Sequence, residues 1–337
     1  MTIELLMAEV ATLMPGAVLV DDLTNSNRAA LARVAVGDET YVAKRNETEE
    51  RFANEVTALR HLPAAVRPGL VAVGAQTVVM EDLGSGDSLA DVLLADDALR
   101  ASEALLVWAR TLATAVQETM HAGGRDDRLD LSEDVAQFLR FAETFGVEGD
   151  IGTDVAAIEE TLSAPSPWFA LGPSDACPDN NRLMPDGSMR LFDFEAAAWR
   201  NVATEAAYTR APFCTCWCVA ALPAGMTAAM EDAFMATLQP VDEERLRDDM
   251  GAAVVGFGLQ MARVLRWFVE NDHPMAPPGV EAPTRGRQYV HGRMLVLEEY
   301  ARRFPSIGAI AARIADEMQR RWPDCTPLPL YPAFRVQ

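Results

Sequence analysis

The sequence predicts an α+β protein in two parts: a small antiparallel sheet with one important helix near the N-terminus, then a larger, mainly helical part. Up to residue 83, short apolar runs alternate with polar or Gly-containing turns, which is typical of strands. After residue 88, apolar residues mostly recur at helical spacing. Gly84-Ser85-Gly86 separates the two regions, and 337 residues suffice for two cores. We therefore expect lobes at 1–83 and 84–337.

The first part should contain two helices and five strands. A short helix is expected before Pro15-Gly16, and a second one at 46–62, where Phe52, Val56 and Leu59 share a face. Gly37-Asp38 lies between two apolar runs and predicts a hairpin. The expected strands are 18–20, 30–36, 40–44, a short one within 66–74, and 76–80.

The second part is helical except for one segment. The expected helices are 102–121, 131–145, 151–162, 227–238, 242–270, 287–304 and 307–322. The exception, LGPSDACPDNNRLMPDGSMRLFDFE at 171–195, predicts a hairpin with strands at 182–184 and 189–192 around a Pro-Asp-Gly-Ser turn.

That hairpin begins just after Asn180 and ends at Asp193, so the two side chains should lie close together. Asp175 is on the loop leading in. Oxygen ligands that converge in this way suit Mg²⁺, which takes one or two protein oxygens together with phosphate oxygens. A surface hairpin with ordinary turn residues is the alternative, because Asp, Asn, Pro and Gly are common in loops for local reasons.

The segment resembles the catalytic and metal-binding region of the aminoglycoside phosphotransferase family, which has a His-Gly-Asp-x-x-x-x-Asn loop followed by Asp-Phe-Glu. Asp175, Asn180 and Asp193-Phe194-Glu195 match, whereas Pro173 and Ser174 replace the usual His and Gly. The resemblance implies a two-lobed, protein-kinase-like fold. It also implies that Asp175 is the catalytic residue and that Asn180 and Asp193 hold Mg²⁺.

The N-terminal part carries further matches. Tyr41-Val42-Ala43-Lys44 resembles the kinase strand whose lysine reaches the nucleotide phosphates, and Glu55 on the following helix matches the glutamate that orients it. Glu47, Glu49 and Glu50 are alternative candidates for the glutamate that orients the lysine, and Glu55 is preferred. Ser26 and Asn27 resemble part of the loop that covers the nucleotide, without its glycine. The segment after the strand at 76–80 resembles the family's hinge, which implies nucleotide contacts at Met80, Glu81 and Leu83.

The resemblance implies an enzyme that transfers a phosphoryl group from ATP or GTP to a hydroxyl of a small molecule. The sequence does not identify the acceptor; an aminoglycoside is one candidate. The alternative is a kinase-fold protein that binds nucleotide or ligand with little or no transfer, which the missing loop glycine and His favour. A protein kinase is disfavoured, since Phe-Glu replaces Phe-Gly and no Ala-Pro-Glu follows.

The net charge of −21 argues against nonspecific binding to nucleic acid or anionic membranes and is compatible with a cationic acceptor. Four acidic residues after the hairpin could contact such an acceptor, although solvated helix faces also explain them: Glu195, Glu205, Glu270 and Asp272.

The location of the protein is predicted from three features. There is no basic segment before an apolar run at the N-terminus, and no apolar window of about 18 residues that would indicate a membrane span. The five cysteines lack the paired spacing of a zinc site, so we expect them to be reduced, buried side chains. A cytoplasmic protein is therefore expected.

Overall fold

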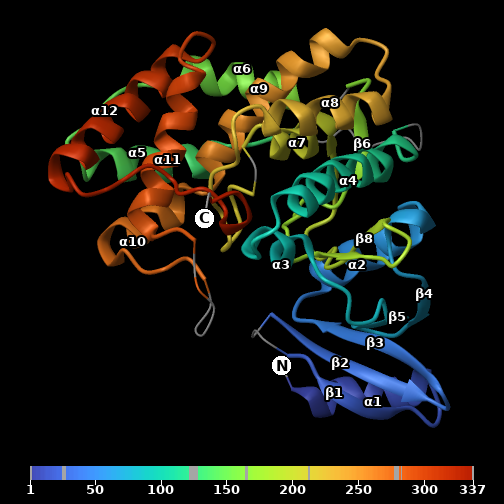
Figure 1. Cartoon of the computed structure of the whole chain (residues 1–337). Coiled ribbons are helices and arrows are strands. Elements are labelled where there is room, and N and C mark those ends of the chain that lie inside the picture. Colours follow the sequence, from blue (N-terminus) through green and yellow to red (C-terminus); the bar gives the residue numbers. More distant parts are fainter. Residues whose placement is uncertain are drawn as a thin grey trace.

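The computed structural model describes residues 2–24, 28–120, 128–163, 166–211, 213–276, 281 and 283–335. A small sheet-containing lobe and a larger helical lobe are visible in Figure 1. The strands are β1 (Val18–Asp22), β2 (Ala29–Val36), β3 (Glu39–Asn46), β4 (Leu70–Val73), β5 (Thr77–Glu81), β6 (Phe169–Gly172), β7 (Asn181–Leu183), β8 (Met189–Leu191) and β9 (Ala198–Asn201). The helices are α1 (Ile3–Leu13), α2 (Glu49–His61), α3 (Leu89–Leu94), α4 (Ala98–Gln117), α5 (Ser132–Glu143), α6 (Gly152–Leu162), α7 (Val202–Ala206), α8 (Met226–Leu238), α9 (Glu243–Gln260), α10 (Ala262–Asn271), α11 (Gly286–Glu299) and α12 (Pro305–Arg321).

The small lobe is built on one antiparallel sheet of five strands in the order β1-β2-β3-β5-β4. β3 lies at its centre and pairs with β2 on one side and β5 on the other, with Lys44 opposite Leu31 and Val78. Successive side chains of a strand point to opposite faces. The sheet therefore sorts its residues between two separate apolar clusters.

One cluster lies under α1 and contains Leu6, Val10, Ala43 and Val79. The other continues into the helical lobe and contains Val78 and Met80 together with Val56 and Leu59 of α2. Because Lys44 follows Ala43, strand alternation places it on the side of Val78 and Met80, toward the helical lobe. The strand pattern by itself thus directs this lysine into the space between the lobes.

The large lobe surrounds α4, whose Trp108 and Leu112 are fully buried. Two two-stranded sheets, β6-β9 and β7-β8, lie beside the helices. The second of these is the predicted hairpin, paired in register from Asn181 opposite Leu191 to Leu183 opposite Met189. Residues 180 and 193 therefore both lie just beyond the open end of this ladder, opposite the turn.

The α+β architecture and its division into a small sheet lobe and a large helical lobe confirm the predicted fold class. The helix predicted at 242–270 is wrong as one element, because it breaks at Met261 into α9 and α10, which are inclined by 57°. There was also no sequence signal for β6, β9 or α7, which are only four or five residues long. The lobe boundary at residues 83 and 84 stays a prediction.

None of the described helices is by itself long and apolar enough to cross a membrane; α9 and α10, taken together as a bent pair, meet those criteria of length and composition.

The start of α12 depends on a buried carboxylate of α6. Asp154 is 5% exposed, and its Oδ2 accepts hydrogen bonds from the backbone N–H groups of Ser306 (2.8 Å) and Ile307 (2.9 Å). We expect Asp154→Ala to lower the free energy of unfolding by about 1–3 kcal/mol, because two N–H groups of the first helical turn lose their acceptor. Urea denaturation measures this. Asp316→Ala, on the exposed face of α12, is the control; an equal loss in both variants would contradict the capping role.

Candidate active site

A cavity of about 610 Å³ separates the two lobes and collects most of the residues that the sequence singled out. Residues of β2, β3 and β5 line one wall, and the segments around the β7-β8 hairpin line the other. Among the lining residues are Lys44, Glu55, Asp175, Asn180 and Asp193. Its volume is within the usual range for ligand sites, about 300–1,000 Å³. Two smaller cavities, of about 200 and 190 Å³, lie in the helical lobe away from these residues.

Lys44 stands between three carboxylates, one from α2 and two from the segment that follows β8. Its Nζ lies 2.6 Å from Glu55 Oε2, 2.5 Å from Asp193 Oδ1 and 3.5 Å from Glu195 Oε2, and the residue is only 5% exposed. Burial alone would lower the pKa of this ammonium, but the carboxylates of Glu55 and Asp193 raise it well above its ordinary value. Lys44 is therefore a fixed positive charge, and Glu55 is its partner on α2, as expected.

Glu55 also reaches the segment that contains Asp193. Its Oε1 accepts a hydrogen bond from the backbone N–H of Phe194 at 3.3 Å, while its Oε2 holds Lys44. Asp193 has a φ of 63°, in the left-handed region that residues with a side chain rarely adopt. Strained backbone of this kind is typical of functional sites, where the surroundings hold it in place.

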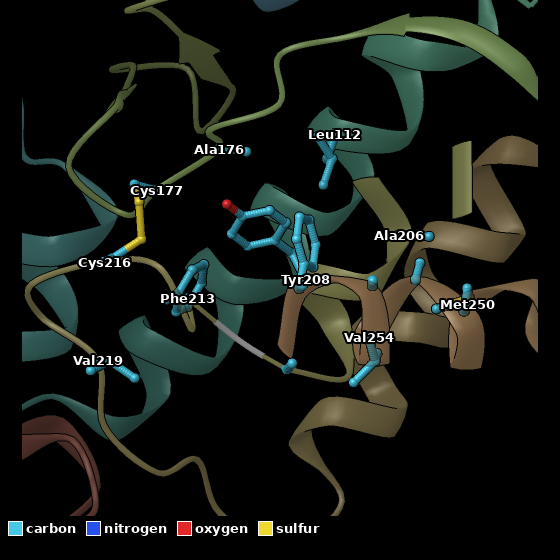
Figure 2. Close-up of a cluster of buried hydrophobic side chains, with 14 of the residues drawn as sticks. Leu112, Ala176, Cys177, Ala206, Tyr208, Phe213, Cys216, Val219, Met250 and Val254 are labelled. Atoms are coloured by element: carbon cyan, nitrogen blue, oxygen red, sulfur yellow. A yellow bond between two sulfur atoms is a disulfide. The ribbon is translucent and has the colours of Figure 1, made fainter. Parts of the chain in front are cut away.

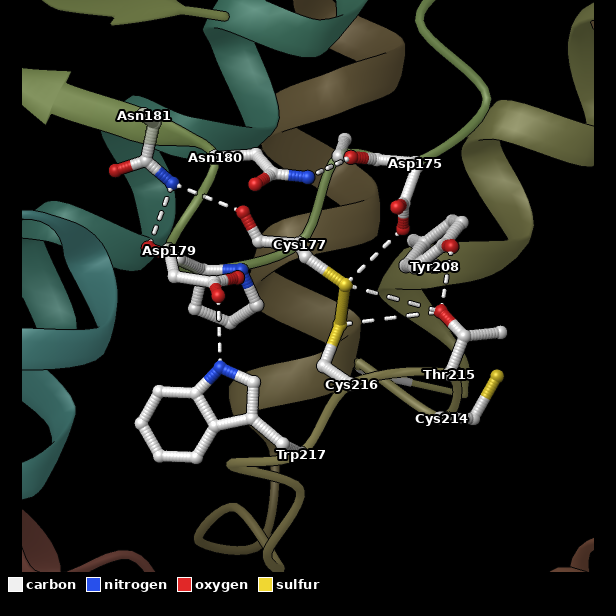
Figure 3. The surroundings of a disulfide bond; sticks show 12 residues. Asp175, Cys177, Asp179, Asn180, Asn181, Tyr208, Cys214, Thr215, Cys216 and Trp217 are labelled. Atoms are coloured by element: carbon white, nitrogen blue, oxygen red, sulfur yellow. Dashed lines mark hydrogen bonds between the residues drawn. A yellow bond between two sulfur atoms is a disulfide. The ribbon is translucent and has the colours of Figure 1, made fainter. Parts of the chain in front are cut away.

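Asp175 and Asn180 lie on the same wall, joined through the loop between β6 and β7. The side-chain amide of Asn180 donates from Nδ2 to the Asp175 carbonyl oxygen at 2.9 Å, so its Oδ1 is the acceptor that remains (Figure 3). The backbone N–H of Phe192 donates to the Asn180 carbonyl at 3.0 Å, which extends the hairpin ladder to the residue before Asp193. The hairpin thus brings Asn180 and Asp193 to one cavity, as predicted.

The electrostatics of this wall keep Asp175 partly protonated near neutrality. Burial, followed by repulsion from Asp193 and Asp179, raises the pKa of Asp175 to about 6. A carboxyl group with such a pKa is suited to accept a proton at neutral pH.

We call the loop at 173–180 the catalytic loop after its predicted catalytic residue, Asp175. It has no His-Gly before Asp175, and other groups hold it. Ser174 adopts a φ of 64°, a conformation that glycine takes without strain. Its N–H donates to the carboxylate of Glu205, at 3.0 and 3.3 Å. Trp108 Nε1 donates to the Ala176 carbonyl at 3.1 Å, and Asn181 Nδ2 donates to the carbonyls of Cys177 and Pro178 at 3.2 and 2.9 Å.

Glu205 is therefore not placed to contact an acceptor. It is 1% exposed and lies behind the loop, against Gly172, where an added Cβ would come within 2.2 Å of Glu205 Oε1. Glu270 pairs with Arg266 and Asp272 with Arg285. Of the four acidic candidates, only Glu195 lines the cavity.

The remaining residues predicted to contact the nucleotide fall into two groups. Met80, Glu81 and Leu83 line the cavity where β5 leaves the small lobe. Ser26 and Asn27 lie outside the described residues. Arg28, which directly follows them, lines the cavity and approaches Glu195 at 3.5 Å.

Several lining residues were missed by the sequence reasoning. Arg28 could have been found from its position after the Ser-Asn pair. Phe192 could have been found as the residue before Asp193, the predicted metal ligand. For Thr215 and Trp217 there was no local signal, because the segment that contains them has no regular secondary structure or periodic pattern.

The prediction that all five cysteines are reduced is wrong. Cys177 and Cys216 form a disulfide, with their Cα atoms 5.9 Å apart, whereas Cys214, Cys218 and Cys325 are free. The bond links the catalytic loop to a segment 39 residues later, a long-range contact that cysteine spacing cannot reveal. The cysteine argument for a cytoplasmic protein therefore no longer stands.

The raised pKa of Asp175 predicts a stability effect in the metal-free protein. Since the folded-state pKa is about 6 and the ordinary value is 3.8, ionising Asp175 destabilises the fold. This cost is absent below the ordinary value and complete above about pH 6. Asp175→Asn should therefore raise the free energy of unfolding by about 1–3 kcal/mol at pH 8, and by less at pH 5. Urea denaturation at both pH values tests this. A loss of stability at pH 8 would contradict it, and exposed Asp316→Asn is the control.

Substitutions of Glu205 should change the free energy of unfolding in a different way, because Glu205 holds the loop without lining the cavity. Glu205→Ala should lower the free energy of unfolding by about 1–3 kcal/mol, since the Ser174 N–H loses its acceptor in a buried place. Glu205→Gln keeps a carbonyl acceptor and should retain most of that stability. Urea denaturation of both variants, with exposed Glu160→Ala as a control, measures the difference. Equal effects of Ala and Gln would show that the hydrogen bond to Ser174 is unimportant.

Comparison with known proteins gives matches at the level of structure only. No protein-family model matches the sequence, and no curated protein matches it. A choline/ethanolamine kinase family protein from Mesorhizobium loti is 14% identical, over 94% of this chain and 100% of that one, with a TM-score of 0.53. A putative aminoglycoside phosphotransferase from Ralstonia eutropha is 11% identical, over 95% and 98%, with a TM-score of 0.51.

A third similar structure is an amicoumacin kinase solved with AMP-PNP, Ca²⁺ and Ami, which is 11% identical over 82% of this chain and 96% of that one, with a TM-score of 0.50. Identities this low establish the fold and nothing finer. The chain has the two-lobed, protein-kinase-like fold of the aminoglycoside phosphotransferases and choline/ethanolamine kinases.

Proposed function

We propose that the protein transfers the γ-phosphoryl group of a nucleoside triphosphate to a hydroxyl group of a small molecule. One observation carries the proposal: Lys44 Nζ lies 2.5 Å from Asp193 Oδ1 inside a cavity that also contains Asp175 and Asn180. A fixed cation, two oxygen ligands for a metal and a carboxylate with a raised pKa are the groups that phosphoryl transfer requires. The similar structures are kinases by their names, and one of them contains a nucleotide analogue with a divalent cation, which supports this choice.

The nucleotide would occupy the side of the cavity formed by the small lobe. Leu31, Val42 and Met80 on the sheet, and Phe192 opposite, provide apolar walls for a flat base. The backbone N–H of Glu81 already donates to the Gly69 carbonyl at 2.8 Å. We therefore assign contacts with the base to the Glu81 carbonyl and the Leu83 N–H. We assign binding of the phosphates of ATP or GTP to Lys44 and Arg28, which line the same cavity.

The donor set fits Mg²⁺, because a carboxylate oxygen of Asp193 and the amide Oδ1 of Asn180 are hard oxygen ligands at one cavity. Bound there, the ion would neutralise phosphate charge, and Asp193 and Asn180 would hold it. Asp193 would then exchange part of its contact with Lys44 for the ion, which frees the ammonium for a phosphate oxygen.

Asp175 would act on the acceptor. Its carboxylate takes the proton of the attacking hydroxyl as the new bond forms between that oxygen and the γ-phosphorus. The bond from phosphorus to the leaving diphosphate oxygen breaks at the same time. Asp175 must be ionised for this role, so transfer should be lost as the pH falls through its pKa.

The side of the cavity next to Asp175 favours a polar, positively charged acceptor. Asp179 and Glu195 line it together with the indole of Trp217, whose Nε1 donates to Asp179 Oδ2 at 2.7 Å. Carboxylates attract an ammonium group, and an aromatic face adds a cation–π contribution. We therefore propose hydroxylated amines, aminoglycosides included, as the first acceptors to test.

The test is acceptor-dependent consumption of Mg²⁺-ATP and Mg²⁺-GTP across a panel of hydroxylated amines and sugars, with product identified by the mass of one added phosphoryl group. Asp175→Ala and Asp193→Ala should lower the rate by about a hundredfold or more, because each removes a group that acts on the reacting centre. Asp186→Ala, at the exposed tip of the same hairpin, should retain activity. Retained turnover in Asp193→Ala would contradict the metal assignment. Nucleotide binding with no transfer to any acceptor would favour a binding protein instead.

A further inference from the structure

The Cys177–Cys216 disulfide joins two segments that are otherwise far apart in the sequence and that both face the cavity. Cys177 lies two residues after Asp175, and Cys216 lies in the segment 213–219 between α7 and α8. Both residues line the cavity although only 6% and 2% of their surface is exposed (Figure 3). The bond thus fixes the catalytic loop to the segment 213–219 at the cavity wall.

The segment fixed in this way provides part of the acceptor side. Thr215 and Trp217, the neighbours of Cys216 in sequence, both line the cavity. Thr215 Oγ1 is hydrogen-bonded to Tyr208 Oη at 2.8 Å, and Trp217 Nε1 donates to Asp179, which belongs to the catalytic loop. One polar contact, from Trp217 to Asp179, and one covalent bond therefore link this wall to the catalytic loop, while the contact with Tyr208 joins it to the turn after α7.

Segment 213–219 has little regular structure of its own. Its backbone–backbone hydrogen bonds are mainly local turns, such as Cys216 N–H to the Phe213 carbonyl at 3.0 Å and Val219 N–H to the Cys216 carbonyl at 3.3 Å. Side chains of α11 hold its start, because the Cys214 carbonyl accepts from Tyr289 Oη at 2.7 Å and from Arg293 Nη1 at 3.1 Å. Phe213 has a φ of 55°, in the left-handed region. Its ring is buried 5.1 Å from that of Trp108, in the apolar cluster behind the disulfide (Figure 2). The segment is anchored at its start by this ring, and its central part depends on Cys216.

The nucleotide side is supported independently, except for Asn180, which belongs to the loop that carries Cys177 and is also held to the hairpin by the N–H of Phe192. Lys44 belongs to β3, Glu55 to α2, and Asp193 to the turn after β8, and they bind one another directly. Neither cysteine belongs to these elements. A change at the disulfide should consequently affect the two halves of the site unequally.

We infer that the Cys177–Cys216 disulfide positions the acceptor side of the cleft, so that reducing it weakens acceptor use while nucleotide binding is retained. For the acceptor readout, this inference rests on the proposed phosphotransfer. Reduction replaces one S–S bond by two thiols, which do not stay at bonding distance. The catalytic loop and the wall that carries Thr215 and Trp217 then lose their covalent link.

The reductant would be a small dithiol or a protein dithiol that enters through the cavity. Its first thiolate attacks one sulfur and releases the other cysteine as a thiolate, and its second thiol then closes a disulfide within the reductant. Two electrons and two protons pass to the protein, which gains the Cys177 and Cys216 thiols. Cys214 and Cys218 are poor internal attackers, because burial raises the pKa of both thiols and keeps them protonated.

The first experiment tests the bond without any assumption about function. Purified protein is denatured with and without a dithiol, alkylated, and analysed by mass spectrometry. Without the dithiol, the free residues Cys214, Cys218 and Cys325 should be labelled, and Cys177 and Cys216 should be protected. Labelling of Cys177 and Cys216 in protein purified without reductant would overturn the inference.

The second experiment tests positioning. Native protein and the double variant Cys177→Ser/Cys216→Ser are compared by hydrogen exchange and by the thermal shift that Mg²⁺-ATP causes. Exchange should rise at residues 213–219 and near Cys177, and the Mg²⁺-ATP shift should stay. Cys325→Ser, far from the cavity, is the matched control. Unchanged exchange at both segments would overturn the inference.

The third experiment uses the acceptor found by the panel. In the double variant, kcat/KM for the acceptor should fall by about 10- to 100-fold, because small misplacements of reacting groups have effects of that size. The KM for nucleotide should change little. Dithiol treatment should reproduce this in the native protein and have no further effect on the double variant. Equal losses for acceptor and nucleotide would contradict the inference and leave the proposed function intact. Absence of transfer in every oxidised sample would contradict the proposed function. The first two experiments would still test whether the disulfide forms and whether it positions segment 213–219.

Discussion

The arrangement of the site depends on one buried cation. The Lys44 ammonium joins the central strand of the small lobe to Glu55 on α2 and to Asp193, which is 149 residues away in the large lobe. Removing such a charge from water is costly, and only the carboxylates that surround it offset the cost. The two lobes must therefore be positioned accurately enough for the Lys44 ammonium to form hydrogen bonds in both of them. A metal ion bound by Asp193, as proposed, would replace part of the contact between Asp193 and Lys44.

The catalytic loop shows how one geometry is reached with different residues. The resemblance led us to expect a His and a Gly before Asp175, and the sequence has Pro173 and Ser174. Ser174 nevertheless adopts the left-handed conformation, and the buried carboxylate of Glu205 accepts its N–H. The cost of the strained conformation is thus offset by hydrogen bonds, from the Ser174 N–H to Glu205 and from Trp108 Nε1 to the Ala176 carbonyl, rather than avoided by the freedom of a glycine.

The parts of the structure that could be predicted from the sequence are those set by local patterns. Alternation along β3 directs Lys44 to the cleft, helical spacing places Glu55 on α2, and the Pro-Asp-Gly-Ser turn closes the hairpin between Asn180 and Asp193. The fold class followed from these elements and is confirmed. The roles of the individual site residues stay predictions until activity is measured.

What could not be predicted depends on contacts between distant segments. Cys177 and Cys216 meet only because the segment before α8 packs back against the catalytic loop. Glu205 is neither an acceptor contact nor a solvated acid, the two interpretations that the sequence offered, because nothing in its neighbours indicates burial behind Ser174. The break at Met261 interrupts a continuous helical pattern without a proline or glycine at that position. In each case tertiary packing overrides the local signal.

The two apolar clusters of the small lobe have a consequence for biosynthesis. The cluster under α1 is complete within the first 83 residues, whereas Val56, Leu59 and Val78 belong to a cluster that continues into the helical lobe. A nascent chain that has emerged only as far as the hinge has no partners for that second face of its sheet. Stable folding of that face of the sheet therefore waits for translation of the helical lobe, which couples maturation of the N-terminal strands to synthesis of the residues that follow them.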